Sequence, residues 1–314
     1  MSVLAEIRRR FAAVSPNVQG MIWMAVAGLI FASFTAIVRY VGSSMNPIQV
    51  SFVRYALGLV FMLPFFVKIS VADLRAANFK LHAIRGILHA IGVLCWFYAM
   101  AHIPIAEVTA MGFTAPVFAT IGAALFLGEK VRARRIIAVV IGLLGAVVIL
   151  RPGFVEIHPG ALAMMLAAPL FAITDLIAKV LTRRESGPAL VAYLSVVVTL
   201  TVMGPALYVW RAPTQEEWLL MIATAGLATL GHLCMIQAVK LAEVSAVQPV
   251  KFLQLAWAAL IGFLVFAEIP EIWTWIGSAI IVGSVTYIAH RESVTRKQAR
   301  LKAAAAKPSS DVEN

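Results

Sequence analysis

Two charged residues stand inside long apolar stretches of the sequence. Lys251 lies eight residues into the stretch 243–266, and Asp175 lies about fifteen residues into the stretch 160–181. A charged side chain at the middle of a bilayer costs roughly 2.5–3.5 kcal/mol on insertion scales, so it persists where it is paired, faces a cavity or serves a function. Lys251 is expected either to bind an anionic or polar group of a substrate or to pair with a carboxylate. Asp175 is expected either to bind a coupling proton or cation or to form a local ion pair with Lys179, four residues further on.

The surroundings of Lys251 favour a binding role. Gln248, Lys251 and Gln254 recur every three residues, which predicts that they share one broad face of a helix. Pro249 removes a backbone donor, and Pro116 does the same in the stretch 106–127. A freed carbonyl is tolerated inside a membrane where it lines a cavity or meets another partner. Proline-interrupted helices at corresponding places in two halves of a chain point to a transport site.

Aromatic and histidine side chains recur at helical spacing elsewhere. His89 and Trp96 are seven residues apart, Phe31 and Thr35 are four apart, and Trp257 follows the polar stripe around Lys251. Such side chains could line a cavity and stack on a planar substrate, and ordinary helix packing or lipid contact is the alternative for each. The histidines lack the spacing of metal ligands, so neither a metal nor a cofactor is expected.

The elements that must hold these residues are membrane-spanning helices. The chain of 314 residues is 61% hydrophobic and 13% charged, against about 25% charged residues in a soluble domain. Apolar stretches of roughly 20 residues predict spanning helices. We place ten of them near residues 20–40, 47–67, 83–101, 106–127, 134–150, 160–181, 188–210, 217–238, 243–266 and 272–289.

The basic residues predict the orientation of these helices. With the N-terminus inside, 20 Lys and Arg residues fall in inner segments, and only Arg151 and Arg211 fall in outer loops. Because the side with more Lys and Arg faces the cytoplasm, both termini are expected to be cytoplasmic. The formal net charge of +11 is explained by this bias, and no nucleic-acid-binding motif accompanies it.

The chain repeats itself at an offset that drifts between 136 and 141 residues. Phe31-Ala32 matches Phe171-Ala172, Gly92 and Cys95 match Gly231 and Cys234, and the segment 106–110 matches 242–246. Each half has five predicted helices, an odd number, so the second half should be inserted upside down relative to the first. Inverted repeats of this kind are the architecture of many secondary transporters, whose substrate sites lie between the halves.

The repeated residues carry a family resemblance. The Phe31-Ala32 and Phe171-Ala172 stretches, the segment 52–55 with Arg54, Gly128-Glu129, and the run from Lys251 to Trp257 leading to Glu268 resemble the EamA-type carriers of the drug/metabolite transporter superfamily. The resemblance covers about residues 18 to 290. It implies a central cavity lined by the first, third, fourth, sixth, eighth and ninth helices, with alternating access, and it leaves the substrate open. The second copy departs from the pattern at Ser195, where the first has Arg54. We expect Arg54 to be structural and not to bind substrate, and it could pair with Glu107.

These observations predict an all-α integral membrane protein with ten transmembrane helices arranged as two inverted five-helix repeats. The expected parts are a basic cytoplasmic segment at 1–18, repeats at 19–150 and 158–290, and a disordered cytoplasmic tail at 291–314. The predicted function is secondary transport of a small metabolite across a bacterial cytoplasmic membrane. A channel-like facilitator is the alternative, and an intramembrane enzyme is less favoured because the sequence has no G-x-S-x-G or H-E-x-x-H motif. A Walker-type nucleotide site is also missing. The oligomeric state stays open.

Overall fold

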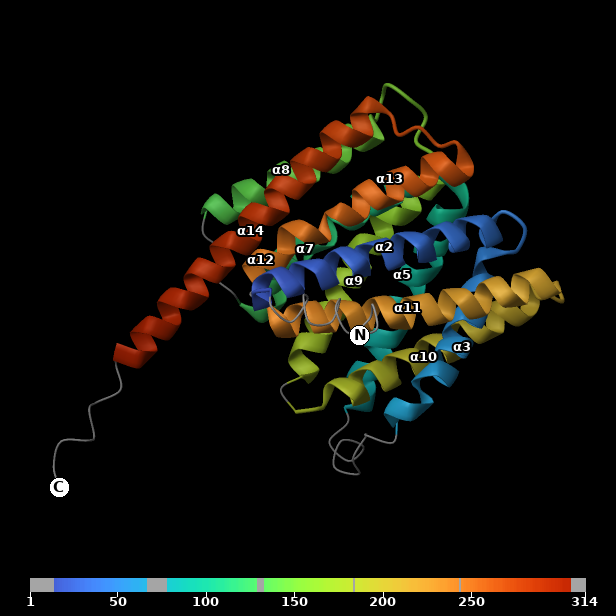
Figure 1. The fold of residues 1–314 in the computed structure, drawn as a ribbon, viewed down its shortest axis with the longest axis horizontal. Coiled ribbons are helices and arrows are strands. Elements are labelled where there is room, and N and C mark those ends of the chain that lie inside the picture. Colours follow the sequence, from blue (N-terminus) through green and yellow to red (C-terminus); the bar gives the residue numbers. More distant parts are fainter. Residues whose placement is uncertain (1–13, 67–77, 129–132, 183, 243, 306–314) are drawn as a thin grey trace, which may run out of the picture.

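The structure is a computed structural model, and it describes residues 14–66, 78–128, 133–182, 184–242 and 244–305. The described chain is almost entirely helical (Figure 1). Its helices are α2 (Pro16–Gly42), α3 (Pro47–Phe66), α5 (Phe79–His102), α6 (Ile105–Gly112), α7 (Ala115–Leu127), α8 (Ala133–Leu150), α9 (Pro159–Leu181), α10 (Gly187–Tyr208), α11 (Gln215–Leu241), α12 (Val244–Lys251), α13 (Leu253–Phe266) and α14 (Ile272–Ala305).

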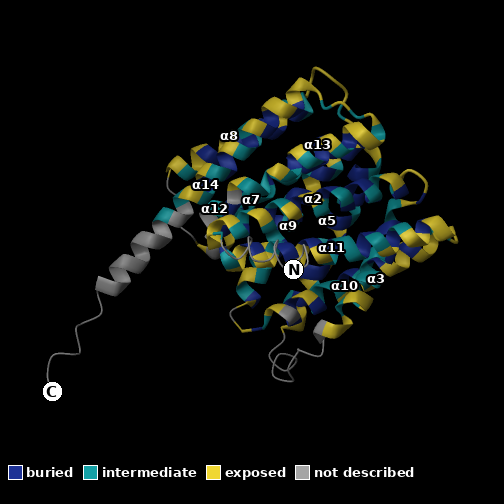
Figure 2. Cartoon of the chain, viewed as in Figure 1, coloured by how far each residue is buried: buried dark blue, intermediate teal, exposed yellow. Residues whose placement is uncertain are grey.

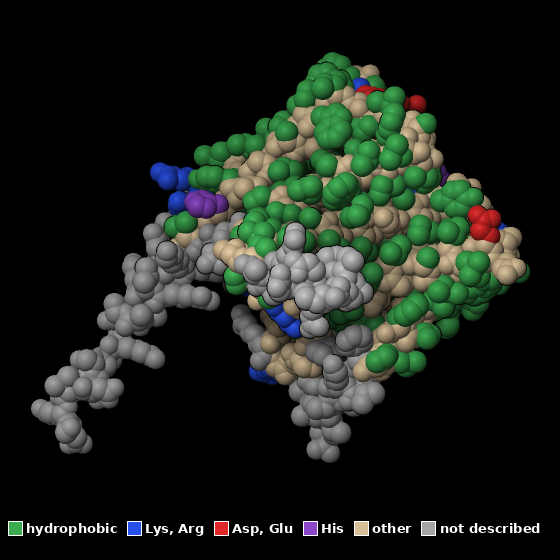
Figure 3. Space-filling view, in the orientation of Figure 1, with side chains coloured by type: hydrophobic (Ala, Val, Ile, Leu, Met, Phe, Trp, Pro, Cys, Tyr) green, Lys and Arg blue, Asp and Glu red, His purple; other side chains and the backbone are tan. Residues whose placement is uncertain are grey.

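Ten segments of the described chain are long and apolar enough to cross a membrane, which confirms the predicted number of spans. Two of them, the fourth and the ninth, are each built from two consecutive helices, α6 with α7 and α12 with α13. Exposed side chains on the outside of the bundle are mostly apolar (Figures 2 and 3), including Leu125, Phe126 and Leu264, which are 72%, 72% and 69% exposed. Such a surface is stable in lipid and would be costly in water.

The helices pack in reciprocal pairs between the two halves of the chain. α2 lies against α11 and α13, and its counterpart α9 lies against α5 and α7. α8 pairs with its own counterpart α14 along the edge of the bundle (Figure 1). Each repeat is therefore packed mainly through contacts with the other repeat. Each repeat has five spans, an odd number, so this packing agrees with the inverted arrangement that the duplication predicts.

Glycines allow two of these contacts to be close. A Cβ atom at Gly231 in α11 would come within 3.0 Å of the Phe31 ring in α2, and one at Gly92 in α5 would come within 3.0 Å of the Phe171 ring in α9. Both pairs join the first helix of one repeat to the third helix of the other. Phe31 matches Phe171 in the repeat, and Gly92 matches Gly231. The contacts of Phe31 with Gly231 and of Phe171 with Gly92 are therefore equivalent.

The two ends of the chain differ in how far the structure describes them. Residues 1–13, most of the predicted basic segment, lie outside the described residues, and α2 already begins at Pro16. The predicted disordered tail is helical as far as Ala305, because α14 continues beyond the membrane-spanning part. This difference has a local cause: residues 296–305 are Arg, Lys, Gln, Leu and Ala, which are among the strongest helix formers.

Candidate functional site

Two phenylalanine–histidine pairs lie where the repeats meet. The Phe31 ring meets the His232 ring edge-on at a centroid distance of 5.1 Å. The Phe171 ring meets the His89 ring at the same distance, with the rings tilted by 53°. In each pair the phenylalanine comes from the first helix of one repeat and the histidine from the third helix of the other. Phe31 and His89 were predicted site residues, whereas the pairing itself depends on which helices are neighbours.

A second aromatic group adjoins the first through His89. The Tyr55 hydroxyl lies 3.3 Å from Nε2 of His89. The guanidinium carbon of Arg54 lies 4.3 Å from the centre of the Tyr55 ring and 5.8 Å from that of Phe34. The predicted site residue Trp96 stacks on Phe34, with centroids 5.7 Å apart and planes within 6° of parallel. These contacts join α2, α3 and α5 around one cation.

The position of Arg54 corrects the prediction that it pairs with Glu107. Its charge acts on His89 and His232, one from each phenylalanine–histidine pair, and its Nε is buried without a hydrogen-bond partner. The charged groups that act on Glu107 are instead Glu271, Arg151 and Glu268. A guanidinium placed over aromatic faces gains cation–π attraction. The spacing of residues along the sequence does not show which rings lie beside Arg54.

Arg85 is a member of the site that the sequence prediction missed. The predicted span 83–101 contains Arg85, but no role in the site was predicted for it; in the structure α5 begins at Phe79, and Arg85 lies inside this helix with only 7% of its surface exposed. Its Nε donates to the Thr174 carbonyl at 3.3 Å, and its Nη1 donates to the Leu190 carbonyl at 2.9 Å. The signal in the sequence was that Arg85 precedes His89 by one helical turn.

Asp175 interacts electrostatically with two cations. The charge on Asp175 acts on both Arg85 and Lys251, which come from α5 and α12. Thr174, the neighbour of Asp175 in α9, has its hydroxyl 3.3 Å from Nδ1 of His89. Asp175 is exposed, while Arg85 is buried and Lys251 is partly buried. The two residues singled out first from the sequence therefore lie within electrostatic range of each other, with Arg85 as a third member.

The ninth span is interrupted beside Lys251. α12 ends at Lys251, and α13 begins at Leu253, with Phe252 between them. Gln254 and Trp257 therefore belong to a different helix from Lys251, which corrects the expectation of one continuous polar face. The side chain of Gln248, in α12, lies outside the described residues. The Trp257 indole nitrogen is buried without a hydrogen-bond partner.

The fourth span is interrupted at the equivalent place. α6 ends at Gly112, and Pro116 stands at the beginning of α7. The interruption of the ninth span, at Phe252, comes three residues after Pro249. Phe252 corresponds to Pro116 at the repeat offset of 136. The rings of Phe113 and Phe252, one from each interruption, meet edge-on at 5.0 Å. Both breaks expected from the prolines thus lie together between the repeats.

Thr35 differs from the other predicted contacts. It is 4% exposed, and its hydroxyl donates to the Ala32 carbonyl of its own helix at 2.8 Å. Its hydrogen bond is satisfied inside α2, and it packs in the core. A Thr hydroxyl in a membrane helix commonly bonds its own backbone in this way.

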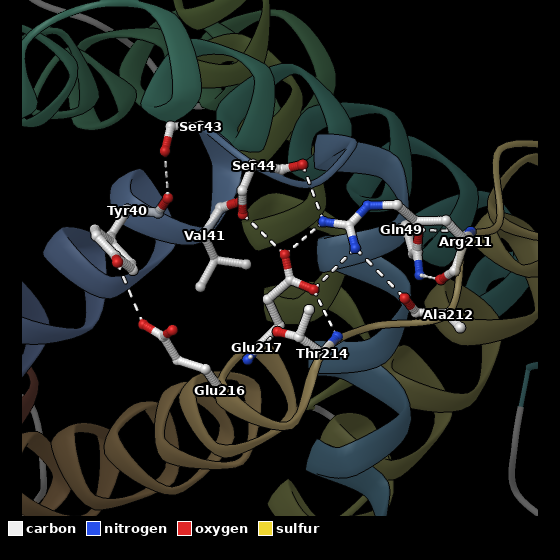
Figure 4. A network of polar contacts seen from close by, with 10 residues as sticks. All are labelled: Tyr40, Val41, Ser43, Ser44, Gln49, Arg211, Ala212, Thr214, Glu216 and Glu217. Atoms are coloured by element: carbon white, nitrogen blue, oxygen red, sulfur yellow. Dashed lines mark hydrogen bonds and ion pairs between the residues drawn. The ribbon is translucent and has the colours of Figure 1, made fainter.

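Polar contacts fasten both ends of the bundle, and we call them the distal latch and the proximal latch. The distal latch lies at the end where α2 stops (Figure 4). Glu217, in the first turn of α11, pairs with Arg211 and accepts a hydrogen bond from the Ser44 hydroxyl at 2.9 Å. Arg211 also donates to the Ser44 carbonyl at 3.0 Å and exchanges two hydrogen bonds with the Gln49 amide.

The proximal latch lies at the end where α2 begins. Nε2 of His82, in the first turn of α5, lies 2.6 Å from Oε2 of Glu185 in the loop after α9. The Asn78 amide donates to the other carboxylate oxygen at 3.2 Å. The latches are counterparts: each ties the start of the third helix of one repeat to the loop after the first helix of the other. Alternating access requires such end contacts to open in turn.

A third contact between the repeats caps a half-helix. Glu268, after α13, accepts a hydrogen bond from the Ile105 amide at the start of α6 at 3.0 Å and pairs with Arg39 at 3.1 Å. A carboxylate at a helix N-terminus satisfies a free donor and the positive end of the dipole. Glu107 lies in the first turn of α6, where the sequence placed it, but the direct hydrogen bond to Ile105 comes from Glu268.

Among the described residues, no group of three or more His, Cys, Asp or Glu side chains could hold a metal ion. The site therefore offers aromatic faces, histidines and a small set of charges. These groups suit reversible binding of an organic molecule.

Comparison with known proteins identifies the family. The model of the EamA-like transporter family matches the chain twice, over residues 18–151 and 158–289. A riboflavin transporter of Vibrio cholerae is 34% identical over 90% of this chain and 96% of its own length. One of Brucella anthropi is 31% identical over 88% and 100%, and an S-adenosylmethionine uptake transporter of Rickettsia bellii is 27% identical over 81% and 87%.

These matches cover both repeats and nearly the whole chain. Together with the ten apolar helices, they make the protein a multi-pass protein of the bacterial inner membrane and a secondary transporter of small metabolites. The chain belongs to the EamA-like transporter family.

Proposed function

We propose that this protein carries riboflavin, or a closely similar planar and uncharged heteroaromatic metabolite, into the cell by alternating access between its repeats. The observation that carries the proposal is the pair of Phe–His contacts, Phe31 with His232 and Phe171 with His89, each of which joins a side chain of one repeat to a side chain of the other. Aromatic side chains from both halves would stack on a flat ring. When the two repeats move relative to each other, the aromatic contacts on both faces of the substrate would change at the same time.

The charges around these rings favour a neutral substrate over a cationic one. Arg54, Arg85 and Lys251 lie in or beside the site, against one carboxylate, Asp175. S-adenosylmethionine carries a sulfonium and an ammonium group against one carboxylate, so it would meet repulsion, which suppresses binding of the wrong partner. Riboflavin is uncharged and offers ring carbonyls to cationic donors. The riboflavin transporters among the relatives support the same choice.

In this proposal each predicted site residue except Thr35 has a role. Phe31, His89 and Trp96 form the aromatic surroundings, with Trp257 offering an indole donor from α13. Lys251, Gln248 and Gln254 supply polar contacts near the interruption of the ninth span. Asp175 takes up and releases the coupling proton, and both termini face the cytoplasm.

Uptake into liposomes that contain the purified protein tests the proposal. Labelled riboflavin should enter saturably, unlabelled riboflavin should compete, and S-adenosylmethionine should compete poorly. Unlabelled riboflavin inside the liposomes should accelerate entry of the label, because a carrier exchanges substrate while a channel does not. Linear uptake without such exchange would favour the channel-like alternative. Strong competition by S-adenosylmethionine with none by riboflavin would overturn the choice of substrate.

Phe31→Ala gives the matched test of the site. Loss of one stacking ring should raise the KM for riboflavin by about ten-fold, the order expected for an aromatic contact with its buried area. Phe263→Ala is the control, because Phe263 is 54% exposed on the outside of α13. Equal transport by the two variants would remove Phe31 from the site.

A further inference from the structure

A groove on the outside of the bundle lies between α8 and α14, and none of its lining residues belongs to the candidate substrate site. Its volume is about 470 Å³, within the roughly 300–1,000 Å³ of small-molecule pockets. It is lined by Arg134, Ile137, Ala138, Ile141, Ala279, Ile280, Gly283, Ser284 and Tyr287. All but three of these side chains are apolar or absent, and the polar ones lie at or near one end.

The groove exists because small residues hold α8 and α14 together beyond it. A Cβ atom at Gly145 would come within 2.9 Å of the Gly277 carbonyl, and one at Gly142 within 2.8 Å of the Ser284 hydroxyl. The Ser284 hydroxyl donates to the Ala138 carbonyl at 2.5 Å. At Gly283, by contrast, a Cβ atom would meet nothing within 4 Å. The groove is therefore open space on a fixed pair of helices.

The length of the groove along the helices is close to the thickness of the hydrocarbon layer of one membrane leaflet. Its lining in α14 runs from Tyr287 to Ala279, eight residues or about 12 Å of helix. Half of a hydrocarbon core is about 15 Å thick. Arg134 and Tyr287 mark the end nearest the start of α8, and Ala279, Ile280 and Ile141 mark the end nearer the middle of the span.

The charged end of the groove has the chemistry of a headgroup site. Arg134 is exposed, and no ion pair or hydrogen bond joins it to another residue in the part of the chain that the structure describes. A guanidinium at the membrane surface attracts anionic lipid and binds phosphate oxygens in a bidentate fashion. Tyr287 belongs to the side-chain type that favours this interface.

We propose that this groove binds an anionic phospholipid, with one acyl chain along the apolar lining and the phosphate at Arg134. The lipid would cover the seam between the fifth and tenth spans, which come from different repeats. Its binding is independent of the substrate, so this proposal stands or falls separately from riboflavin transport.

Native mass spectrometry of the detergent-solubilised protein with added phosphatidylglycerol or phosphatidylcholine tests the site. Phosphatidylglycerol should be retained in preference. Gly283→Leu should weaken its retention roughly ten-fold, which is the effect of excluding about two methylene groups. Arg134→Gln should weaken it about five-fold and remove the preference over phosphatidylcholine.

Two controls make the result decisive. Gly204→Leu adds the same side chain in α10 where a Cβ also meets nothing within 4 Å, and Arg184→Gln removes an exposed arginine elsewhere. Neither should change lipid retention. Equal retention by Gly283→Leu and Gly204→Leu would overturn the proposal. So would a dimer in the same spectra that Gly283→Leu converts to monomer, because the groove would then bind a second copy of the chain.

Discussion

Asp175, Arg85 and Lys251 bring two cations and one carboxylate to the boundary between the repeats. A buried charge without a partner is costly, and breaking a charged set by removing one member leaves the others uncompensated. Neutralising Asp175 by protonation would do the same to Lys251, whereas Arg85 would keep the attraction of Glu185. Binding of a proton to Asp175 would therefore change the net charge of the site that binds the substrate.

Asp175→Asn should therefore abolish accumulation driven by a proton gradient while leaving exchange of riboflavin across the membrane. The amide keeps the shape of the side chain but cannot take up the coupling proton. Uptake into liposomes with and without an imposed pH gradient measures both activities. Asp175→Glu is the control and should keep part of the coupled uptake. Gradient-driven accumulation by Asp175→Asn would show that the coupling group lies elsewhere.

Lys251→Met should lower the affinity for riboflavin by about ten-fold, because a hydrogen bond from a charged donor is worth roughly 1.5–3 kcal/mol. Methionine keeps an unbranched apolar stem, so packing at the end of α12 should be retained. The KM of transport and the thermal stabilisation by riboflavin are the measurements, with Lys240→Met as a control at the end of α11. Intact transport by Lys251→Met would assign the lysine a structural role.

At the scale of elements, the two latches join counterpart helices, with the roles of the two repeats exchanged. The distal latch joins α11 to the loop after α2 through Glu217, and the proximal latch joins α5 to the loop after α9 through Glu185. The chemistry of the two differs, since the first pairs a carboxylate with arginine and the second with histidine. Weakening one latch should favour the conformation that is open at that end.

The two native cysteines can report this opening. Cys95 lies in α5 towards its distal end, and its counterpart Cys234 lies in α11 towards its proximal end; both are free. Glu217→Gln should accelerate alkylation of Cys95 several-fold, and Glu185→Gln should accelerate that of Cys234, as followed by peptide mass spectrometry. Glu216→Gln, next to Glu217 but outside its pairing with Arg211, is the control. Equal acceleration of both cysteines by either variant would indicate general loosening and not directed opening.

At the scale of the whole molecule, each repeat is packed mainly against helices of the other repeat. The matched contacts of Phe31 with Gly231 and of Phe171 with Gly92 join the first and third helices across the boundary. An inverted pair can exchange conformations between its halves, which turns an outward-open carrier into an inward-open one. The orientation in the membrane decides which end is open to the cytoplasm.

The charge bias predicts that both termini are cytoplasmic. Fusion of green fluorescent protein to the C-terminus should give fluorescent cells, and fusion of alkaline phosphatase at the same place should be inactive, because these reporters work on opposite sides of the membrane. The same reporters fused after Arg151, in the loop between the repeats, should give the reverse result. A reversed pattern at both positions would invert the topology.

The sequence by itself determined the number of spans, the duplication, the family and the interruption of the fourth and ninth spans. These follow from apolar length, repeated dipeptides and the missing donors of Pro116 and Pro249, all of which are local. It also identified Lys251, Asp175, Phe31, His89 and Trp96 as candidates. It did not single out Arg85, because the partners of this residue in α9 and α10 are remote in the sequence.

Only the tertiary structure decided which helices are neighbours. The partners of Phe31, Arg54 and Glu268 could not be predicted, since Phe31 and His232 are separated by 201 residues along the chain. In a membrane protein the lipid-facing and buried faces of a helix are both apolar, so hydropathy does not reveal which face turns inward. Close approach at small residues such as Gly231 and Gly92 sets that choice, and it places the aromatic and charged groups at one boundary.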